Sequence, residues 1–382
     1  MINPACERLK YVDVDRIRRM VDEGPYDAIV ALSPDNVPYF SGFYNMDLRL
    51  LPERLHIAVW PRSGEPAFVV MERRARLMQP SQTYIRDIRG YEGEGLDSMR
   101  ALAEVLRDRR VDEGLIGFEG RTFPGGHLLE LMRLLPKLRF ENAVPLLDRI
   151  RSIKTPAELE VQTRINRLTT DAIDSAFRAA RPGQTEIEIA ARMEFEFLSG
   201  GGEQITAPLL AAGPRTGLWH GMPSQQKVEN GMVLITDFGG QLDGYYSDIA
   251  RTAVMGRATE HQKDVHAKIT EIKHRIVDYI NPGMPAGEAA SFGIKCYEKL
   301  KLEFKWFILG HGIGLGLHEE PQLYPWVTEP ILEGMVMMIE VGFSDFPNES
   351  FHVEDLIHVT AKGAEYVTDA TRHDKLWELG ID

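Results

Sequence analysis

Residues 231–254, GMVLITDFGGQLDGYYSDIARTAV, restrict the possible folds of this chain more than any other stretch. An apolar run ends at Asp237, a stretch rich in turn residues follows, and Asp248 lies on the returning run. This pattern predicts a hairpin of two antiparallel strands, whose residues face one another at about 5 Å. A carboxylate in an apolar strand is costly to bury unless a positive charge lies beside it. From this segment alone, a turn Asp237 and a surface Asp248 remain the simpler alternative.

Length and charge limit the class of protein. The chain has 382 residues, which suggests two domains, and its formal net charge is −13. That charge argues against binding to nucleic acid or to an anionic membrane, both of which favour a basic surface. The two cysteines show no metal or redox spacing, and we find neither a signal peptide nor an apolar run long enough to span a membrane. We therefore expect a cytoplasmic protein.

Residues 1–150 are predicted to form a first α/β domain, in which strands alternate with helices. The expected strands are 26–32, 55–60, 67–71 and 115–118, the expected helices are 14–21, 96–109 and 126–135, and 36–43 is an aromatic loop or short helix. Gly90, Gly93 and Gly95 have the wrong spacing for a dinucleotide-binding motif, so we interpret them as a surface loop.

Residues 151–382 form the second predicted domain, which opens with a long helix from Thr155-Pro156 and then repeats itself loosely. The turn at 181–186 and the turn at 281–288 each introduce a helix, a Gly-rich segment and a hairpin of two apolar strands. The second hairpin carries Glu340 and Glu354. The repeat predicts two related α/β halves that meet at a pseudo-two-fold axis, with one carboxylate pair from each half.

A glycine-dense segment, residues 307–321, lies between the two hairpins and contains His311 and His318. Glycine lets the backbone approach a ligand closely, so two histidines here favour a functional site over a buried core histidine. His311 joins Asp237, Asp248, Glu340 and Glu354 as a candidate metal ligand, which gives a set dominated by oxygen donors with one imidazole. Four clustered carboxylates cannot all stay ionised unpaired, and two divalent cations would balance them. Such a site fits Mn²⁺, Co²⁺, Fe²⁺ or Zn²⁺.

These residues carry a resemblance to the pita-bread metallopeptidases, family M24, which include Xaa-Pro dipeptidase (prolidase) and aminopeptidase P. The family pattern is an Asp, a second Asp eleven residues later, a His in a glycine-rich segment, and two Glu on a hairpin, and all five positions are filled here. The resemblance implies an α/β fold with an N-terminal creatinase/prolidase-like domain, a C-terminal pita-bread domain, a peptide or small-molecule substrate, and a homodimer.

The resemblance also implies roles for single residues. Asp237 would bind one metal ion, Asp248 and Glu354 would bridge the two ions, and His311 and Glu340 would complete the ligand shell of the second ion. Glu340 would also accept and transfer a proton. Three further residues match the substrate side: His220 faces the substrate, His318 stabilises the tetrahedral intermediate, and Trp219 is either a pocket wall or ordinary core packing.

The chain departs from the family pattern in three places. Glu340-Val341-Gly342 replaces Glu-Pro-Gly, His352 replaces an Arg two residues before the last Glu, and residues 319–339 contain no Arg or Lys. Gln322 stands where prolidases commonly place the Arg that holds the carboxylate of the dipeptide. An amide lacks the charged bidentate contact of Arg, so the metal site is expected to be intact and the substrate anchor altered.

Three functions fit these departures. The enzyme cleaves longer Xaa-Pro peptides, or it holds the dipeptide with another anchor such as Arg215 or the partner subunit, or it acts on a small molecule. The last reading corresponds to the family's dimethylsulfoniopropionate lyase. A non-catalytic binding module is the competing class, and the five retained ligands argue against it. We predict metal-dependent hydrolysis of an amide bond that precedes proline.

Overall fold

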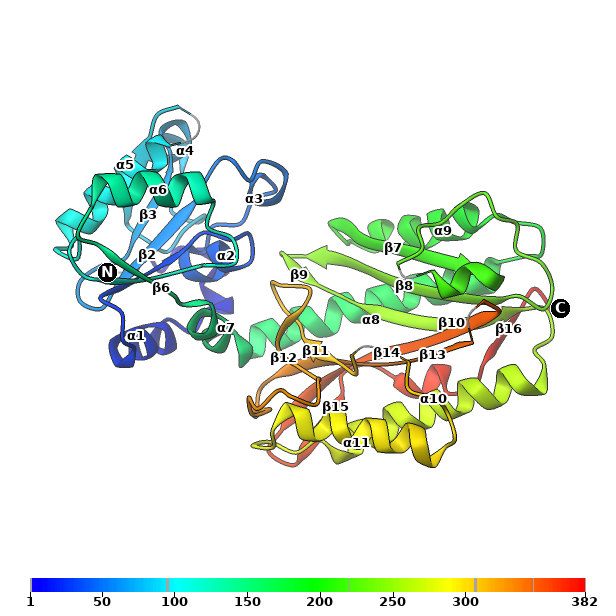
Figure 1. Cartoon of the computed structure of the whole chain (residues 1–382). Helices are drawn as coiled ribbons and strands as arrows, with labels where there is room; N and C mark the ends of the chain where they lie inside the picture. The colour runs from blue at the N-terminus through cyan, green and yellow to red at the C-terminus, as the bar shows by residue number, and fades with distance from the viewer. Residues whose placement is uncertain (1, 94–95, 219, 306–307, 346, 382) are drawn as a thin grey trace. The chain divides into compact units, whose positions relative to one another are not determined.

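The computed structural model describes residues 2–93, 96–218, 220–305, 308–345 and 347–381 of the chain (Figure 1). The chain forms two compact units, the first comprising residues 1–151 and 155–157 and the second residues 152–154 and 158–382. No helix among these described residues combines the length and the apolar character that crossing a membrane would require.

The first unit is a six-stranded mixed sheet with strand order β4-β3-β2-β1-β5-β6. β2 runs antiparallel to both of its neighbours, and the other three pairs are parallel. The strands are β1 (Ala28–Ala31), β2 (Ile57–Pro61), β3 (Ala67–Met71), β4 (Asp87–Tyr91), β5 (Leu115–Phe118) and β6 (Arg139–Asn142). The helices are α1 (Val14–Glu23), α2 (Asn36–Ser41), α3 (Asp47–Leu50), α4 (Glu72–Leu77), α5 (Asp97–Asp108), α6 (Gly125–Leu134) and α7 (Val144–Ser152).

The predicted elements of this unit are all present, but the two edge strands were not predicted. Gly90 lies in β4 opposite Val70, so its interpretation as a surface-loop residue was wrong. A Cβ at Gly90 would lie 2.9 Å from the Cα of Glu72, the first residue of α4, so the close packing of α4 on this strand favours glycine.

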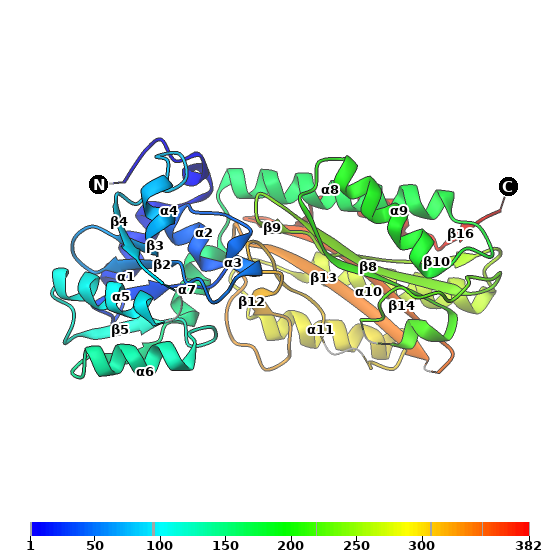
Figure 2. The same cartoon turned by 90° about the horizontal axis from the view of Figure 1, so that it is seen from above.

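The second unit consists of two five-stranded sheets with their helices (Figures 1 and 2). One sheet contains β7 (Gln204–Ala212), β8 (Val233–Leu242), β9 (Tyr245–Tyr246), β10 (Ile249–Met255) and β16 (Trp377–Leu379). The other contains β11 (His311–Gly312), β12 (Glu319–Gln322), β13 (Val336–Asp345), β14 (Glu349–Thr360) and β15 (Gly363–Tyr366). The helices are α8 (Pro156–Ala179), α9 (Glu186–Ser199), α10 (Glu260–Tyr279) and α11 (Ala286–Lys299).

The two halves of this unit repeat one another, as predicted. α9 and α11 each have 14 residues, and each follows a turn whose glycine has a positive φ, Gly183 at 89° and Gly283 at 91°. α9 packs on β7 in the first half, whereas α10 packs on β13 and β14 in the second. Apolar residues of α10 and β13, among them Ile269, Ile276 and Ile339, are fully buried in one core cluster. The core thus fixes both hairpins that carry the predicted carboxylates.

Candidate metal centre

The first carboxylate pair comes from the hairpin of β8 and β10. Asp237 lies on β8 and is paired in register with Ala250, whereas Asp248 directly precedes β10 instead of lying inside the strand, which corrects the predicted arrangement. Gly239 allows the carboxylates to converge, since a Cβ there would lie 2.1 Å from the Ser247 backbone oxygen. The chain before Asp248 therefore passes over β8 at a distance that only glycine permits.

The second carboxylate pair lies on β13 and β14, where Glu340 and Glu354 are direct cross-strand partners. Opposite residues of an antiparallel pair point to the same face. Both side chains are at least 90% buried, with relative exposures of 6% for Glu340 and 2% for Glu354. Together with Asp237 and Asp248 they place four carboxylates around one point.

His311 lies on β11, opposite Met338 of β13. Its Nδ1 lies 2.9 Å from the Gly312 backbone oxygen, and this hydrogen bond fixes the tautomer with the proton on Nδ1. The unprotonated Nε2 then faces the carboxylates, at 3.8 Å from Asp248, 3.9 Å from Glu340 and 3.6 Å from Glu354. That orientation suits a metal ligand.

The predicted ligands form overlapping groups that suit a metal ion. Potential ligand atoms lie within 4.8 Å of one another in the group Asp237, Asp248 and Glu354, and in the group His311, Glu340 and Glu354. Burial, and then the neighbouring carboxylates, raises the pKa of Asp248 and Glu354 well above their ordinary values. Asp237 Oδ1 is buried and has no hydrogen-bond partner within the described ranges. A bound cation would relieve both features, so these residues fit a metal.

Three further histidines lie close to the carboxylate cluster. The ring of His318 stacks on His311 with centroids 3.9 Å apart. His318 is still exposed in part, but its partial removal from water, and next the proximity of His311, lowers its pKa to about 4, so its imidazole is neutral at pH 7. His352 Nε2 lies 3.5 Å from Glu340 Oε2. His220 is exposed and adopts a positive φ of 50°, which is uncommon for a residue with a side chain.

A cavity of about 290 Å³ joins these residues. Its wall includes the five predicted ligands together with His220, His318 and His352. Gln322 is not part of this wall. It lies on β12, where it is paired in register with His311 of β11. Trp219 lies outside the described residues. The cavity is also lined by residues that the sequence did not indicate, namely Leu209, Leu210, Ala211, Thr216, Lys305, Ser344 and Ser350.

Arg215, one candidate anchor, is already bound elsewhere. Its Nε lies 3.1 Å from both carboxylate oxygens of Glu186, which is fully buried, and its Nη2 donates to the Met222 backbone oxygen. Arg215 is also absent from the cavity wall. Arg215 thus neutralises a buried carboxylate and lies outside the described wall of the cavity.

Side chains join the two sheets directly behind the cluster. The Thr252 hydroxyl donates to the His352 backbone oxygen and accepts from the His352 backbone N–H, both at 2.8 Å. Arg251 Nη1 donates to the Glu354 backbone oxygen at 2.6 Å, and Nη2 binds Asp355 at the same distance. These contacts tie β10 to β14 beside both carboxylate pairs.

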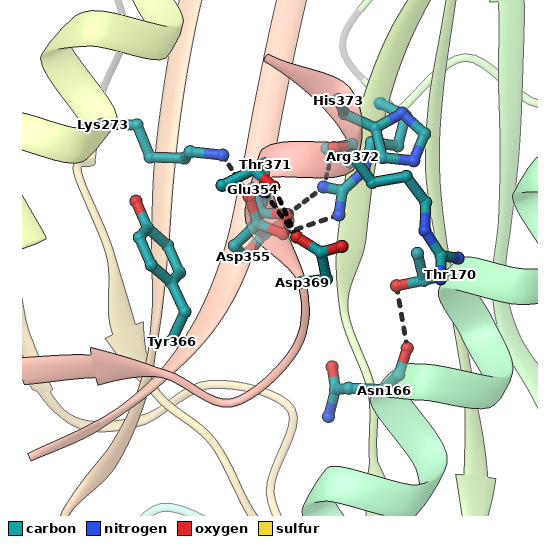
Figure 3. A network of polar contacts seen from close by, with 12 residues as sticks. Asn166, Thr170, Lys273, Glu354, Asp355, Tyr366, Asp369, Thr371, Arg372 and His373 are labelled. Atoms are coloured by element: carbon teal, nitrogen blue, oxygen red, sulfur yellow. Dashed lines mark hydrogen bonds and ion pairs between the residues drawn. The ribbon is translucent and has the colours of Figure 1, made fainter.

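Asp355 is the centre of this buried network. Figure 3 shows Lys273 extending from α10 toward Asp355, with which it forms an ion pair. Burial would raise the pKa of Asp355, but the charges of Arg251 and Lys273 outweigh it and lower the pKa. The sequence contained one sign of this role: Asp355 directly follows Glu354. Neighbouring residues of a strand point to opposite faces, so the Asp355 side chain points away from the face that carries Glu354.

Comparisons with known proteins show the family and the fold of the chain. Residues 161–361 match "Metallopeptidase family M24", and residues 14–153 match "Creatinase/Prolidase N-terminal domain". The chain is 26% identical over 364 residues to the Xaa-Pro dipeptidase of Pyrococcus furiosus, covering 94% of this chain and 98% of the relative. It is 29% identical over 277 residues to the Xaa-Pro dipeptidase of Pyrococcus horikoshii, covering 70% and 79%.

A solved structure shows the same fold over nearly the whole chain. The X-Pro aminopeptidase from Thermotoga maritima superposes with a TM-score of 0.82 at 22% identity, covering 96% of this chain and 100% of that chain. The predicted pita-bread fold with its creatinase/prolidase-like N-terminal domain is thus confirmed. Because the family match spans more than half of the sequence, the chain belongs to metallopeptidase family M24 and is a metallohydrolase.

Proposed function

We propose that this protein is an Xaa-Pro dipeptidase, which hydrolyses the amide bond before proline at a site for two divalent metal ions. The observation that carries the proposal is the shared ligand: Glu354 belongs both to the group with Asp237 and Asp248 and to the group with His311 and Glu340. Relatives named Xaa-Pro dipeptidase that align over the length of the chain support the substrate class. The oxygen-rich donor set with one imidazole suits Mn²⁺, Co²⁺, Zn²⁺ or Fe²⁺.

Bound ions would lower the pKa of a water molecule and polarise the carbonyl to be cleaved. The residues of the chain then handle protons and orientation. Glu340 would accept a proton from the attacking water and pass it to the leaving amine, and His352 Nε2 lies 3.5 Å from its carboxylate. His318, neutral but still carrying one N–H, would donate to the oxygen of the tetrahedral intermediate. His220 at the cavity wall would contact the substrate.

The proposal extends to location and assembly. Both cysteines, Cys6 and Cys296, are free and buried, which suits a reducing compartment, so we place the protein in the cytoplasm. We also infer a homodimer, which light scattering on the purified protein would test by its mass of twice 43.2 kDa.

The test is an assay of metal-stripped protein reloaded with each of the four ions. The substrates are leucyl-proline, a longer peptide with proline second, and dimethylsulfoniopropionate. Cleavage of leucyl-proline is the expected result. Cleavage of only the longer peptide would make the enzyme an aminopeptidase, and action on the sulfonium compound alone would overturn the peptidase proposal. The relatives give no support to that last activity.

A further inference from the structure

A cavity in the first unit, about 430 Å³ in volume, has a basic wall, although the protein as a whole has a formal net charge of −13. The charged residues of this wall are three arginines, Arg54, Arg73 and Arg74, and one carboxylate, Asp47. The wall itself therefore carries an excess of two positive charges. A hollow lined by one sign of charge attracts small ions of the opposite sign.

The pairing of β2 with β3 brings these arginines together. The two strands are antiparallel, and Ile57 of β2 is paired in register with Val69 of β3. The segment that enters β2 and the segment that leaves β3 therefore lie at the same edge of the sheet. Arg54 lies in the first segment, and Arg73 and Arg74 lie in α4, which directly follows β3. The fold thus gathers cations that are distant in sequence.

His56, which directly precedes β2, adds a buried polar atom to the wall of this cavity. The residue is only 4% exposed, and its ring stacks on Phe43 with centroids 5.1 Å apart. His56 Nδ1 is buried and has no hydrogen-bond partner within the part of the chain that the structure describes. Buried polar atoms are nearly always hydrogen-bonded, so a ligand in the cavity would satisfy Nδ1.

The surroundings of His56 make it a neutral hydrogen-bond donor. Burial, and next the positive charge of Arg74, lowers the pKa of His56 to about 4, so the imidazole is uncharged at pH 7. A neutral imidazole carries one N–H, which it can donate to an anion. Stacking on Phe43 holds the ring in place before a ligand arrives.

The arginines differ in how they are held. Arg74 forms an ion pair with Asp47, and its guanidinium lies 5.6 Å from the centre of the Phe43 ring. Asp47 balances the charge of Arg74, so Arg54 and the exposed Arg73 supply the excess charge of the wall. Guanidinium groups bind phosphate oxygens through two parallel hydrogen bonds, which favours an oxyanion as the ligand.

The size of the excess charge selects among oxyanions. A phosphate group carries close to two negative charges near neutral pH and would balance the wall, whereas a carboxylate would balance only half of the excess. An adjoining cavity of about 250 Å³ shares Arg54 and His56 and is lined mainly by apolar residues, among them Leu48 and Leu55. The adjoining cavity offers space for an apolar group attached to the phosphate.

We propose that this cavity of the first unit binds a phosphate group, with Arg54 and Arg73 on its oxygens and His56 Nδ1 donating a hydrogen bond. The shared chemistry is that of a phosphate dianion, either free or as a small monoester. The residues of this site belong to the first unit, whereas the candidate metal ligands belong to the second. The proposal is therefore independent of the peptidase function.

Calorimetry with three probes tests the proposal at pH 8, on metal-loaded and on metal-stripped protein. The probes are phenyl phosphate, inorganic phosphate and benzoate. Phenyl phosphate should bind both forms of the protein, and about 10-fold more tightly than benzoate, because the carboxylate has one charge fewer. Tighter binding of phenyl phosphate than of inorganic phosphate would identify the ligand as a monoester, and equal or weaker binding would identify it as the free anion.

Matched variants locate the bound phosphate. Arg73→Gln should weaken the binding of phenyl phosphate to metal-stripped protein about 10-fold or more. Arg76→Gln is the control, because Arg76 lies on the same helix but binds Glu72 and is not part of the wall. His56→Phe keeps an aromatic ring against Phe43 and removes the donor, so it should weaken binding about 10-fold as well. Circular dichroism would confirm that each variant is folded.

Three results would overturn the proposal. The first is binding of phenyl phosphate that disappears when the metal is removed, since it would place the phosphate at the metal centre. The second is binding of benzoate as tight as that of phenyl phosphate. The third is an equal loss of affinity in Arg73→Gln and Arg76→Gln, which would indicate a general effect of charge.

Discussion

At the scale of single residues, His318 shows how surroundings set chemistry. Its stacking on His311 and its partial removal from water keep the imidazole neutral at pH 7. A neutral imidazole donates one hydrogen bond without bringing a positive charge toward the metal ions. The residue is therefore suited to binding an oxyanion, and it is not needed to hold the ligand cluster together.

Replacing His318 should separate catalysis from metal binding. For His318→Ala we expect kcat to fall by about 10²- to 10³-fold, as for the loss of one oxyanion donor, while the metal content stays that of the wild type. Kinetics and elemental analysis of the same preparation would check both. A variant that lost its metal together with its activity would show that His318 is a ligand, as its proximity to Asp248 and His311 also permits.

The raised pKa values of Asp248 and Glu354 predict how metal-free protein responds to pH. Both groups hold protons in the folded state that they release on unfolding above their ordinary values of 3.8 and 4.5. The free energy of unfolding of metal-free protein should therefore fall as pH rises from about 5 toward 8. Urea unfolding at several pH values would measure this slope.

Asp248→Asn is the matched control for the pH experiment, because it removes one of the two titrating groups. Its metal-free form should show a smaller loss of stability over the same pH range. A wild-type stability that rises with pH in this range, or an unchanged slope in the variant, would contradict the assigned directions of the pKa shifts.

At the scale of elements, the apolar pattern predicted those strands that have a buried core. β3 and β5 have the predicted boundaries, and both functional hairpins are present. The edge strands β4 and β6 were missed because their sequences, DIRGY and RFEN, carry charges at partly exposed positions. An edge strand forms by backbone pairing to its neighbour, and that pairing leaves little trace in the pattern of side chains.

The contacts that join the two halves could not be predicted from either half. Arg251 and Asp355 belong to different sheets, and only the folded arrangement of β10 beside β14 brings them together. The five candidate ligands were identifiable because their spacing follows the strands. Lys305 was not, because it lies in a connecting segment whose path depends on packing.

The buried network of Arg251, Lys273 and Asp355 contains two cations and one anion. The substitution Asp355→Asn would remove the only negative charge of this network and leave both cations buried and unbalanced. We expect it to lower the free energy of unfolding by about 3–5 kcal/mol. Lys273→Met leaves a balanced pair of Arg251 and Asp355 and should cost far less. Urea unfolding of the two variants would compare them. Equal losses, or a larger loss for Lys273→Met, would contradict this distribution of charge.

At the scale of the whole molecule, the repeated halves explain why one site forms. Each half contributes a hairpin with two carboxylates, and the side chains between β10 and β14 place the hairpins next to each other. The family relationship fixes the fold and the hydrolytic chemistry. It does not fix how the substrate is held, since Gln322, which stands where an Arg was expected, does not line the cavity.

Metal stoichiometry is the most direct measurement of the proposed site. Wild-type protein, stripped and titrated with Mn²⁺, should bind two ions for each chain, and Glu354→Gln should lose high-affinity binding of both together with activity, because Glu354 is shared by both ligand groups. The protein must remain folded by circular dichroism. One ion in the wild type, or two ions with full turnover in Glu354→Gln, would contradict the assignment.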